Sequence, residues 1–145
     1  MYSELPAGSG QTPRNAEWVW PAPATGAVSQ ARDRTRCFLA AGPTRPDPEA
    51  LADALLVVSE LVSNVVRHAP GPCTLDLSEG DDLLTIAVSD SSRELPQPRP
   101  GDVDQGGGFG WHLVRGLTQR LLVQLWPGDG KTVTATMRCP ATALG

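Results

Sequence analysis

One long segment, residues 48–68, constrains the fold of this chain more than any other. Its start, Asp47-Pro48-Glu49, combines a capping side chain, a proline that the first turn tolerates and an acid at the helix N-terminus. Pro70 marks its end, because proline does not continue a helix. At about 100° per residue the apolar side chains form one stripe, at Leu51, Leu55, Val58, Val62 and Val65. We therefore expect a long helix that buries this stripe against a second layer.

The other periodic segments predict that this second layer is a sheet. Residues 74–78 and 83–89 alternate apolar and polar side chains around a turn at 80–82, and a second hairpin follows. The expected strands are 18–20 at an edge, 74–78, 83–89, 120–126 and 131–138, and the expected helices are 28–41, 48–68 and 111–119. Short turns between strands, with helices covering one face, predict an α+β two-layer sandwich with a mixed, mostly antiparallel sheet.

Composition is typical of one soluble domain and argues against several functional classes. We place the domain at 17–140, between a mobile N-terminal tail, 1–16, and a C-terminal tail, 141–145. A net charge of −4 gives no basic field for direct nucleic-acid binding. No apolar run approaches the roughly 18 residues of a membrane helix, and no secretory signal begins the chain. Three widely spaced cysteines indicate reduced thiols in the cytoplasm.

Glu60 and Asn64 are the first candidate site residues. They stand four apart, so they share one face of the expected helix. Glu can act as a general base, and the amide oxygen of Asn is a ligand that a hard cation accepts. Leu56 and Val57 lie one turn earlier and give this face apolar walls, as in a pocket. The alternative interpretation is an ordinary solvated helix face.

A glycine-rich turn, residues 106–110, opens the third expected helix. A helix N-terminus presents unpaired N–H groups and partial positive charge, which favour phosphate, and glycine lets the backbone approach a ligand closely. The alternative is a flexible loop before a helix. Gly130-Lys131-Thr132 does not form a phosphate-binding loop, because a strand pattern follows it rather than a helix.

Asp90 is a third candidate, since it ends an apolar strand and precedes a long loop, 91–105. A carboxylate buried at that position needs a hydrogen-bond donor, and the exocyclic amino group of a purine is one. The alternative is an ordinary turn aspartate.

Taken in order, these features resemble the GHKL ATPase superfamily, which includes histidine kinases, gyrase-type ATPases and Hsp90. Residues 57–69, Val-Val-Ser-Glu-Leu-Val-Ser-Asn-Val-Val-Arg-His-Ala, are very similar to the N box of small bacterial anti-sigma-factor serine/threonine kinases. The resemblance covers about residues 18–138 and implies the Bergerat fold. Its other carriers are Asp90 after a strand, Gly108-x-Gly110 opening a helix and Gly130-Lys131-Thr132 at the last strand.

The resemblance implies a site for ATP and Mg²⁺. It makes Asn64 the Mg²⁺ ligand, Glu60 the catalytic base and Asp90 the partner of the adenine amino group, with 91–105 as the ATP lid. The remaining cofactor-binding positions are Gly106, Gly108, Phe109, Gly110 and Thr132, the last as a hydroxyl near the adenine. Phosphoryl transfer depends chiefly on positioning and charge neutralisation, which such a set of residues can supply.

One box departs from the family pattern. The superfamily usually has Asp-x-Gly-x-Gly after its adenine strand, whereas residues 90–94 here read Asp-Ser-Ser-Arg-Glu, and Trp111 replaces the usual aliphatic residue. The resemblance implies an anti-sigma-factor kinase that phosphorylates an antagonist protein or binds a sigma factor, in the cytoplasm and as a homodimer. Two alternatives stay open: a non-catalytic protein-binding anti-sigma module with weak or no ATP binding, and a detached histidine-kinase catalytic domain.

Overall fold

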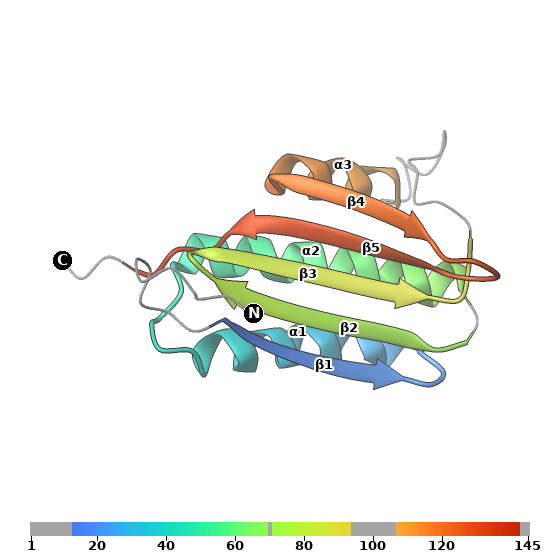
Figure 1. Cartoon of the computed structure of the whole chain (residues 1–145), viewed down its shortest axis with the longest axis horizontal. Coiled ribbons are helices and arrows are strands. Elements are labelled where there is room, and N and C mark those ends of the chain that lie inside the picture. Colours follow the sequence, from blue (N-terminus) through green and yellow to red (C-terminus); the bar gives the residue numbers. More distant parts are fainter. Residues whose placement is uncertain (1–12, 70, 94–106, 143–145) are drawn as a thin grey trace, which may run out of the picture.

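The chain folds into a five-stranded antiparallel sheet with helices on one face (Figure 1). The computed structural model describes residues 13–69, 71–93 and 107–142, and the elements counted here lie in those residues. The strands are β1 (Arg14–Trp20), β2 (Cys73–Gly80), β3 (Leu83–Asp90), β4 (Arg120–Leu125) and β5 (Lys131–Arg138). The helices are α1 (Thr25–Ala40), α2 (Pro48–His68) and α3 (Gly107–Leu117). The expected α+β two-layer sandwich is confirmed, but each described strand pair is antiparallel, so the sheet is not mixed.

The sheet order is β1-β2-β3-β5-β4, which makes β1 and β4 the edges. β2 and β3 form a hairpin through Asp81 and Asp82, whose φ angles of 53° and 62° suit the two-residue turns that join twisted strands. β5 lies between β3 and β4 and places Lys131 opposite Asp90. This register brings the end of β3 and the start of β5 to the end of the sheet where α2 also finishes (Figure 1).

Side-chain alternation gives the sheet a buried face and an exposed face. On β2, β3 and β5 every second residue faces the helices and is buried, while the residues between them are mostly polar and partly exposed. α2 packs one apolar side on the buried face, where Val57, Val58 and Val62 have no exposed surface. The core therefore lies between the sheet and the helices, and apolar burial there is the main source of stability.

α2 has the bounds that the sequence predicts. Asp47 caps it, since the backbone N–H of Ala50 donates to the Asp47 carboxylate over 3.0 Å. Ala69, in an extended conformation, follows its last turn. Although α2 has 21 residues, no helix in the described part of the chain is both long enough and apolar enough to cross a membrane.

The first strand begins earlier than the sequence predicts. β1 begins at Arg14, so residues 14–16 of the expected tail pair with β2, and residues 1–12 lie outside the described part. Arg14 explains the longer strand, because its guanidinium donates to the carboxylate of Glu79 and to the carbonyl of Phe38. Its ring contact with Phe38, 4.2 Å from the centroid, adds a cation–π interaction.

The first residues of the expected C-terminal tail are also held by backbone contacts. Ala141 bridges Pro46, and the backbone N–H of Thr142 donates to the carbonyl of Arg45 over 2.8 Å. Residues 141 and 142 of the expected C-terminal tail are thus held beside the start of α2, and 143–145 lie outside the described residues.

Candidate functional site

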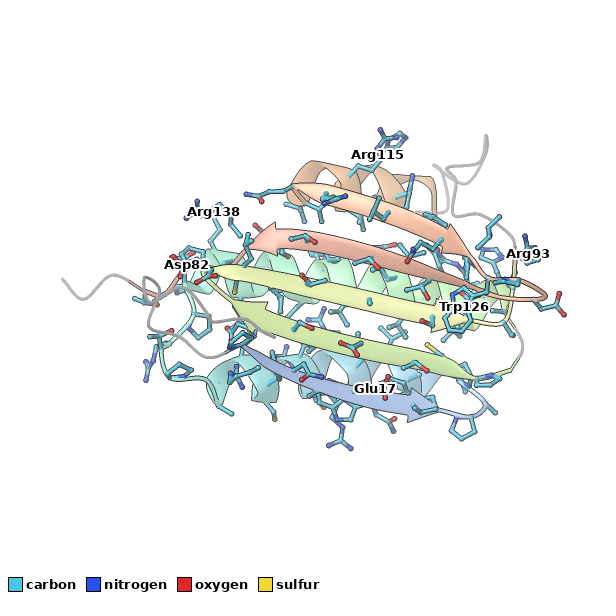
Figure 2. All side chains as sticks on the ribbon, viewed as in Figure 1. Glu17, Asp82, Arg93, Arg115, Trp126 and Arg138 are labelled. Carbon is cyan, nitrogen blue, oxygen red and sulfur yellow. The ribbon has the colours of Figure 1, made fainter. Side chains whose placement is uncertain are left out.

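The candidate residues gather at one end of the sandwich. The C-terminal half of α2, the end of β3, the start of α3 and the turn from β4 to β5 all lie at the same end in Figure 1. Figure 2 shows Arg93 and Trp126 at this end, with Asp82 and Arg138 at the opposite one. The fold therefore places segments that are far apart in the sequence, from the C-terminal half of α2 to the start of β5, at one end of the molecule.

Glu60 lies directly against the start of α3. An ideal Cβ built on Gly110 would stand 1.9 Å from Glu60 Oε2 and 2.3 Å from its Cδ, so no side chain fits at Gly110 unless the carboxylate moves. Glu60 is half-buried and Gly110 is buried. The first turn of a helix carries partial positive charge and N–H groups without helical acceptors. A proton-accepting carboxylate thus borders a surface that favours anions.

The glycine-rich segment is helical earlier than the sequence predicts. α3 begins at Gly107, so Gly108, Phe109 and Gly110 form its first turn, whereas the predicted helix began at 111. Glycine disfavours helices, which is why local propensity placed the boundary too late. Gly106 and the expected lid residues 94–105 lie outside the described residues.

Asn64 continues the face of α2 that carries Glu60. It is half-buried, and its Oδ1 accepts a hydrogen bond of 2.9 Å from Nη2 of Arg67. Arg67 is exposed, so water or a cation can replace this contact at small cost. The amide oxygen is therefore available as a ligand for a hard cation such as Mg²⁺.

Asp90 forms a buried ion pair with Lys131. Nζ of Lys131 lies 3.0 Å from each carboxylate oxygen and 3.2 Å from the carbonyl oxygen of Ser92. The backbone N–H of Ser92 also donates to Asp90 Oδ1 over 2.8 Å. Only 7% of the Lys131 side chain and 4% of the Asp90 side chain are exposed. The carboxylate that the sequence assigned to a base amino group is therefore already hydrogen-bonded within the protein.

Thr132 lies on the opposite face of the sheet from Asp90. Its hydroxyl is 2.8 Å from the hydroxyl of Ser89 and accepts a 2.9 Å hydrogen bond from the indole N–H of Trp126. Strand alternation is the reason, because Lys131 takes the helix-facing position and turns Thr132 outward. The structure thus does not bring Thr132 together with Asp90, and the prediction of an adenine-side hydroxyl gains no support from its placement.

The turn between β4 and β5 packs closely on Asp90. Gly130 has a φ angle of +116°, and a Cβ there would stand 2.8 Å from the carbonyl oxygen of Asp90. Arg93 also holds this turn, since its guanidinium donates to the carbonyl groups of Trp126 and Gly128, the latter over 2.8 Å. The surroundings of Asp90 are therefore fixed by the turn as well as by Lys131.

Burial and the negative charge of Asp90 both affect the pKa of the neighbouring Cys73 thiol. Burial, and then the negative charge of Asp90, raise the pKa of the Cys73 thiol to about 11. A thiol that stays protonated at neutral pH is a poor nucleophile. Cys73 is thus a structural neighbour of the site.

Lys131 is the site residue that the sequence reasoning missed, because it entered only as part of the Gly130-Lys131-Thr132 motif and was given no role of its own. A signal was present: Lys131 shares the apolar face of its strand with Val133, Ala135 and Met137. A cation on a buried face needs a buried anion. Asp90, which continues the apolar face of β3, is such an anion.

Comparisons with known proteins agree with this architecture. A model of the histidine kinase-like ATPase domain family matches residues 20–137, and the chain belongs to this family. The crystal structure of the RsbU and RsbW domains of Rv1364c from Mycobacterium tuberculosis is similar in fold, with a TM-score of 0.66 and 20% sequence identity. That match covers 90% of this chain and 33% of the other, so this chain spans about a third of its neighbour's length. A comparison with curated proteins found no match.

These matches confirm the GHKL resemblance and the Bergerat-type fold. The residues fit Mg²⁺ and phosphate at one part of the site, where the amide of Asn64 follows Glu60 by one turn of α2 and the backbone of Gly110 lies against the Glu60 carboxylate. The residues fit a purine base less well at the other part of the site, because both carboxylate oxygens of Asp90 already accept hydrogen bonds from Lys131. We call the first part, Glu60, Asn64 and Gly110, the phosphate end, and the second, Asp90 and Lys131, the base end.

Proposed function

We propose that this chain is an ATP-binding anti-sigma-factor serine/threonine kinase that phosphorylates an anti-sigma-factor antagonist. The observation that carries the proposal is the carboxylate of Glu60 against Gly110 in the first turn of α3. That contact joins a general base to a helix N-terminus that favours phosphate. A glutamate on a fully solvated helix face would not lie against the backbone of a neighbouring helix, as Glu60 does at Gly110.

Each residue of the phosphate end has a defined task in this proposal. Glu60 takes the proton of the attacking Ser or Thr hydroxyl. The oxygen of that hydroxyl bonds to the γ-phosphorus of ATP, and the bond between the γ-phosphorus and the β,γ-bridging oxygen breaks. Asn64 would hold the Mg²⁺ that neutralises the phosphate charge, and the N–H groups near Gly110 would bind phosphate oxygens. ATP supplies the phosphoryl group, and ADP is the leaving group.

The partner class rests on the N-box sequence at 57–69 and on the likeness in fold to a structure that contains an RsbW domain. The partners in this proposal are a sigma factor and an antagonist protein. The antagonist presents the hydroxyl, the kinase acts in the cytoplasm, and a homodimer is the expected assembly.

Isothermal titration with Mg·ATP tests the nucleotide site. Wild type should bind, and Asn64→Ala should weaken binding, because the metal loses a ligand. Glu60→Gln should keep most of the affinity but lose transfer of labelled phosphate to the antagonist. No binding by wild type, or equal binding by Asn64→Ala, would contradict the proposal. Ser63→Ala is a matched control, since it changes a half-buried neighbour that has no assigned role.

The buried Asp90–Lys131 pair favours a second candidate, a non-catalytic anti-sigma module that binds its partner without nucleotide. In that case a pull-down recovers a sigma factor or an antagonist equally with and without Mg·ATP. Radiolabel that passes from γ-labelled ATP to the partner would exclude this candidate.

A further inference from the structure

The base end contains the one lysine of the chain. All other members of the twelve Lys and Arg residues are arginines, and it is the lysine that pairs with Asp90. An ammonium group is compact and carries three N–H donors, whereas guanidinium is a planar fork. Lys131 has three close acceptors, the two oxygens of Asp90 and the carbonyl of Ser92. The lysine is thus matched to this site.

The ammonium of Lys131 has the chemistry of the group that a purine would bring. An exocyclic amino group donates N–H bonds to a carboxylate, and Lys131 donates the same kind of bond at the same oxygens. The lysine bond is also charge-assisted, and charge-assisted bonds are the stronger ones. A purine can use Asp90 only where Lys131 gives up one of its contacts.

We propose that Lys131 is a built-in occupant of the base end, which holds Asp90 in place of a purine and lowers the affinity of the site for nucleotide. This inference rests on the proposed nucleotide site and specifies how that site is restrained. Nucleotide binding then depends mainly on the phosphate end, and base contacts form only when Lys131 moves away.

Three probes separate the two ends. Adenosine tests the base end alone, Mg·pyrophosphate tests the phosphate end alone, and Mg·ATP tests both. Lys131→Met removes the ammonium while keeping a long side chain. It should bind adenosine and Mg·ATP at least about tenfold more tightly than wild type, the equivalent of one charge-assisted hydrogen bond. Its affinity for Mg·pyrophosphate should stay within about twofold of wild type, since the charge removed lies at the base end.

Two further variants serve as controls for loss of a positive charge and for loss of folding. Arg138→Met removes a cation from the exposed far end of the same strand, so it should bind all three probes like wild type. If Lys131→Met does not fold, Asp90→Asn/Lys131→Met is compared with Asp90→Asn, because the amide keeps an acceptor for a base without a buried charge. The double variant should again bind adenosine more tightly than its reference.

The result that overturns the inference is a folded lysine variant whose affinity for adenosine and Mg·ATP does not rise. If wild type binds Mg·ATP in that case, the proposed kinase stands and the restraint by Lys131 fails. If neither protein binds it, both proposals fail. Protein labelled with ¹⁵N-lysine gives one side-chain signal, which should move on adenosine binding and stay in place with Mg·pyrophosphate. Adenosine binding that leaves this signal unmoved would also overturn the inference.

Discussion

The phosphate end and the base end of the site differ in what holds their key side chains. At the phosphate end, Glu60 lies against bare glycine backbone, and Oδ1 of Asn64 accepts a hydrogen bond from the exposed guanidinium of Arg67. At the base end, the side chain of Asp90 is almost fully buried and accepts hydrogen bonds from Nζ of Lys131 and the backbone N–H of Ser92. The first end needs only a weak contact to change before a ligand binds, whereas the second needs a buried ion pair to open.

In the proposed site, this difference separates the groups for the chemical step from the group for recognition of the nucleobase. The residues that would take a proton and hold a cation in the proposal, Glu60 and Asn64, lie at the phosphate end. Asp90, which would recognise the nucleobase, is paired with Lys131 of the same chain. The two functions proposed above, a kinase and a non-catalytic binding module, therefore differ chiefly in what they require of the base end.

The largest expected effect comes from breaking the base-end ion pair. Asp90→Ala leaves the ammonium of Lys131 buried with only a carbonyl partner. Removing one member of a buried pair costs about 3–5 kcal/mol, so the free energy of unfolding should fall by that amount in urea denaturation. Asp33→Ala breaks the exposed pair with Arg36, at 70% and 48% side-chain exposure, and should cost less than about 0.5 kcal/mol. Equal losses in the two variants would show that the base end is not a buried pair in solution.

The phosphate end is tested by two glycines of one helix. Gly110→Ala places a methyl group where Glu60 now lies, so the carboxylate must move and phosphoryl transfer should fall about 100-fold, or about 2.7 kcal/mol in activation free energy. Gly116→Ala meets nothing within 4 Å, so it should leave transfer unchanged and raise stability by up to about 1 kcal/mol. The measurements are transfer of labelled phosphate and thermal denaturation. Equal transfer rates in both variants would contradict the role of the Glu60–Gly110 contact.

The turn beside the base end offers a third matched pair. Gly130→Ala combines a φ angle of +116° with a contact of 2.8 Å to the carbonyl of Asp90, so it should cost about 2–3 kcal/mol in stability. Gly128→Ala has a φ angle of +88° but open space, so strain alone should cost about 1 kcal/mol. Urea denaturation measures both. A smaller loss at Gly130 than at Gly128 would mean that the turn does not press on Asp90.

Local signals explain how much of the fold could be predicted from the sequence. The bounds of α2 follow from a cap, a first-turn proline and a final proline, and each of these acts within a few residues. β5 was predicted with its observed bounds because alternation and a glycine turn are equally local. The starts of β1 and α3 were missed, since Arg14 is held by distant partners and the first turn of α3 packs on Glu60 of α2 through Gly110, despite the low helix propensity of glycine.

The base end could not be predicted in the same way. Asp90 and Lys131 are 41 positions apart, and only the pairing of β3 with β5 makes them neighbours. The same register decides that Thr132 turns away from the helices. A family motif carries residue identities from one protein to another, but it does not say which face of a strand each residue takes.

A pH-dependent effect concerns Cys73, which lies beside the base end. Burial and then Asp90 raise the pKa of its thiol to about 11, above the ordinary value of 9.0. The folded protein thus keeps a proton that the unfolded chain loses first. The free energy of unfolding should therefore fall between about pH 9 and 11, by on the order of 2 kcal/mol for this thiol. Wild type and Cys73→Ala, compared by urea denaturation across that range, isolate this contribution; parallel pH profiles would contradict it.

Lys131 links this thiol to the comparison of the two ends. If the ammonium neutralises Asp90, its removal exposes Cys73 to an uncompensated negative charge. In a Cys37→Ser background, Lys131→Gln should raise the pKa of Cys73 further, by about half a unit, or about 0.7 kcal/mol. Cys139 is the internal control, because burial, Glu79, Asp47 and Asp82 set its pKa and none of these contacts Lys131. Thiolate absorbance during a pH titration follows both groups. An unchanged pKa of Cys73 would mean that the ammonium does not hold the Asp90 carboxylate in solution, and the base end would then be as open to ligand as the phosphate end.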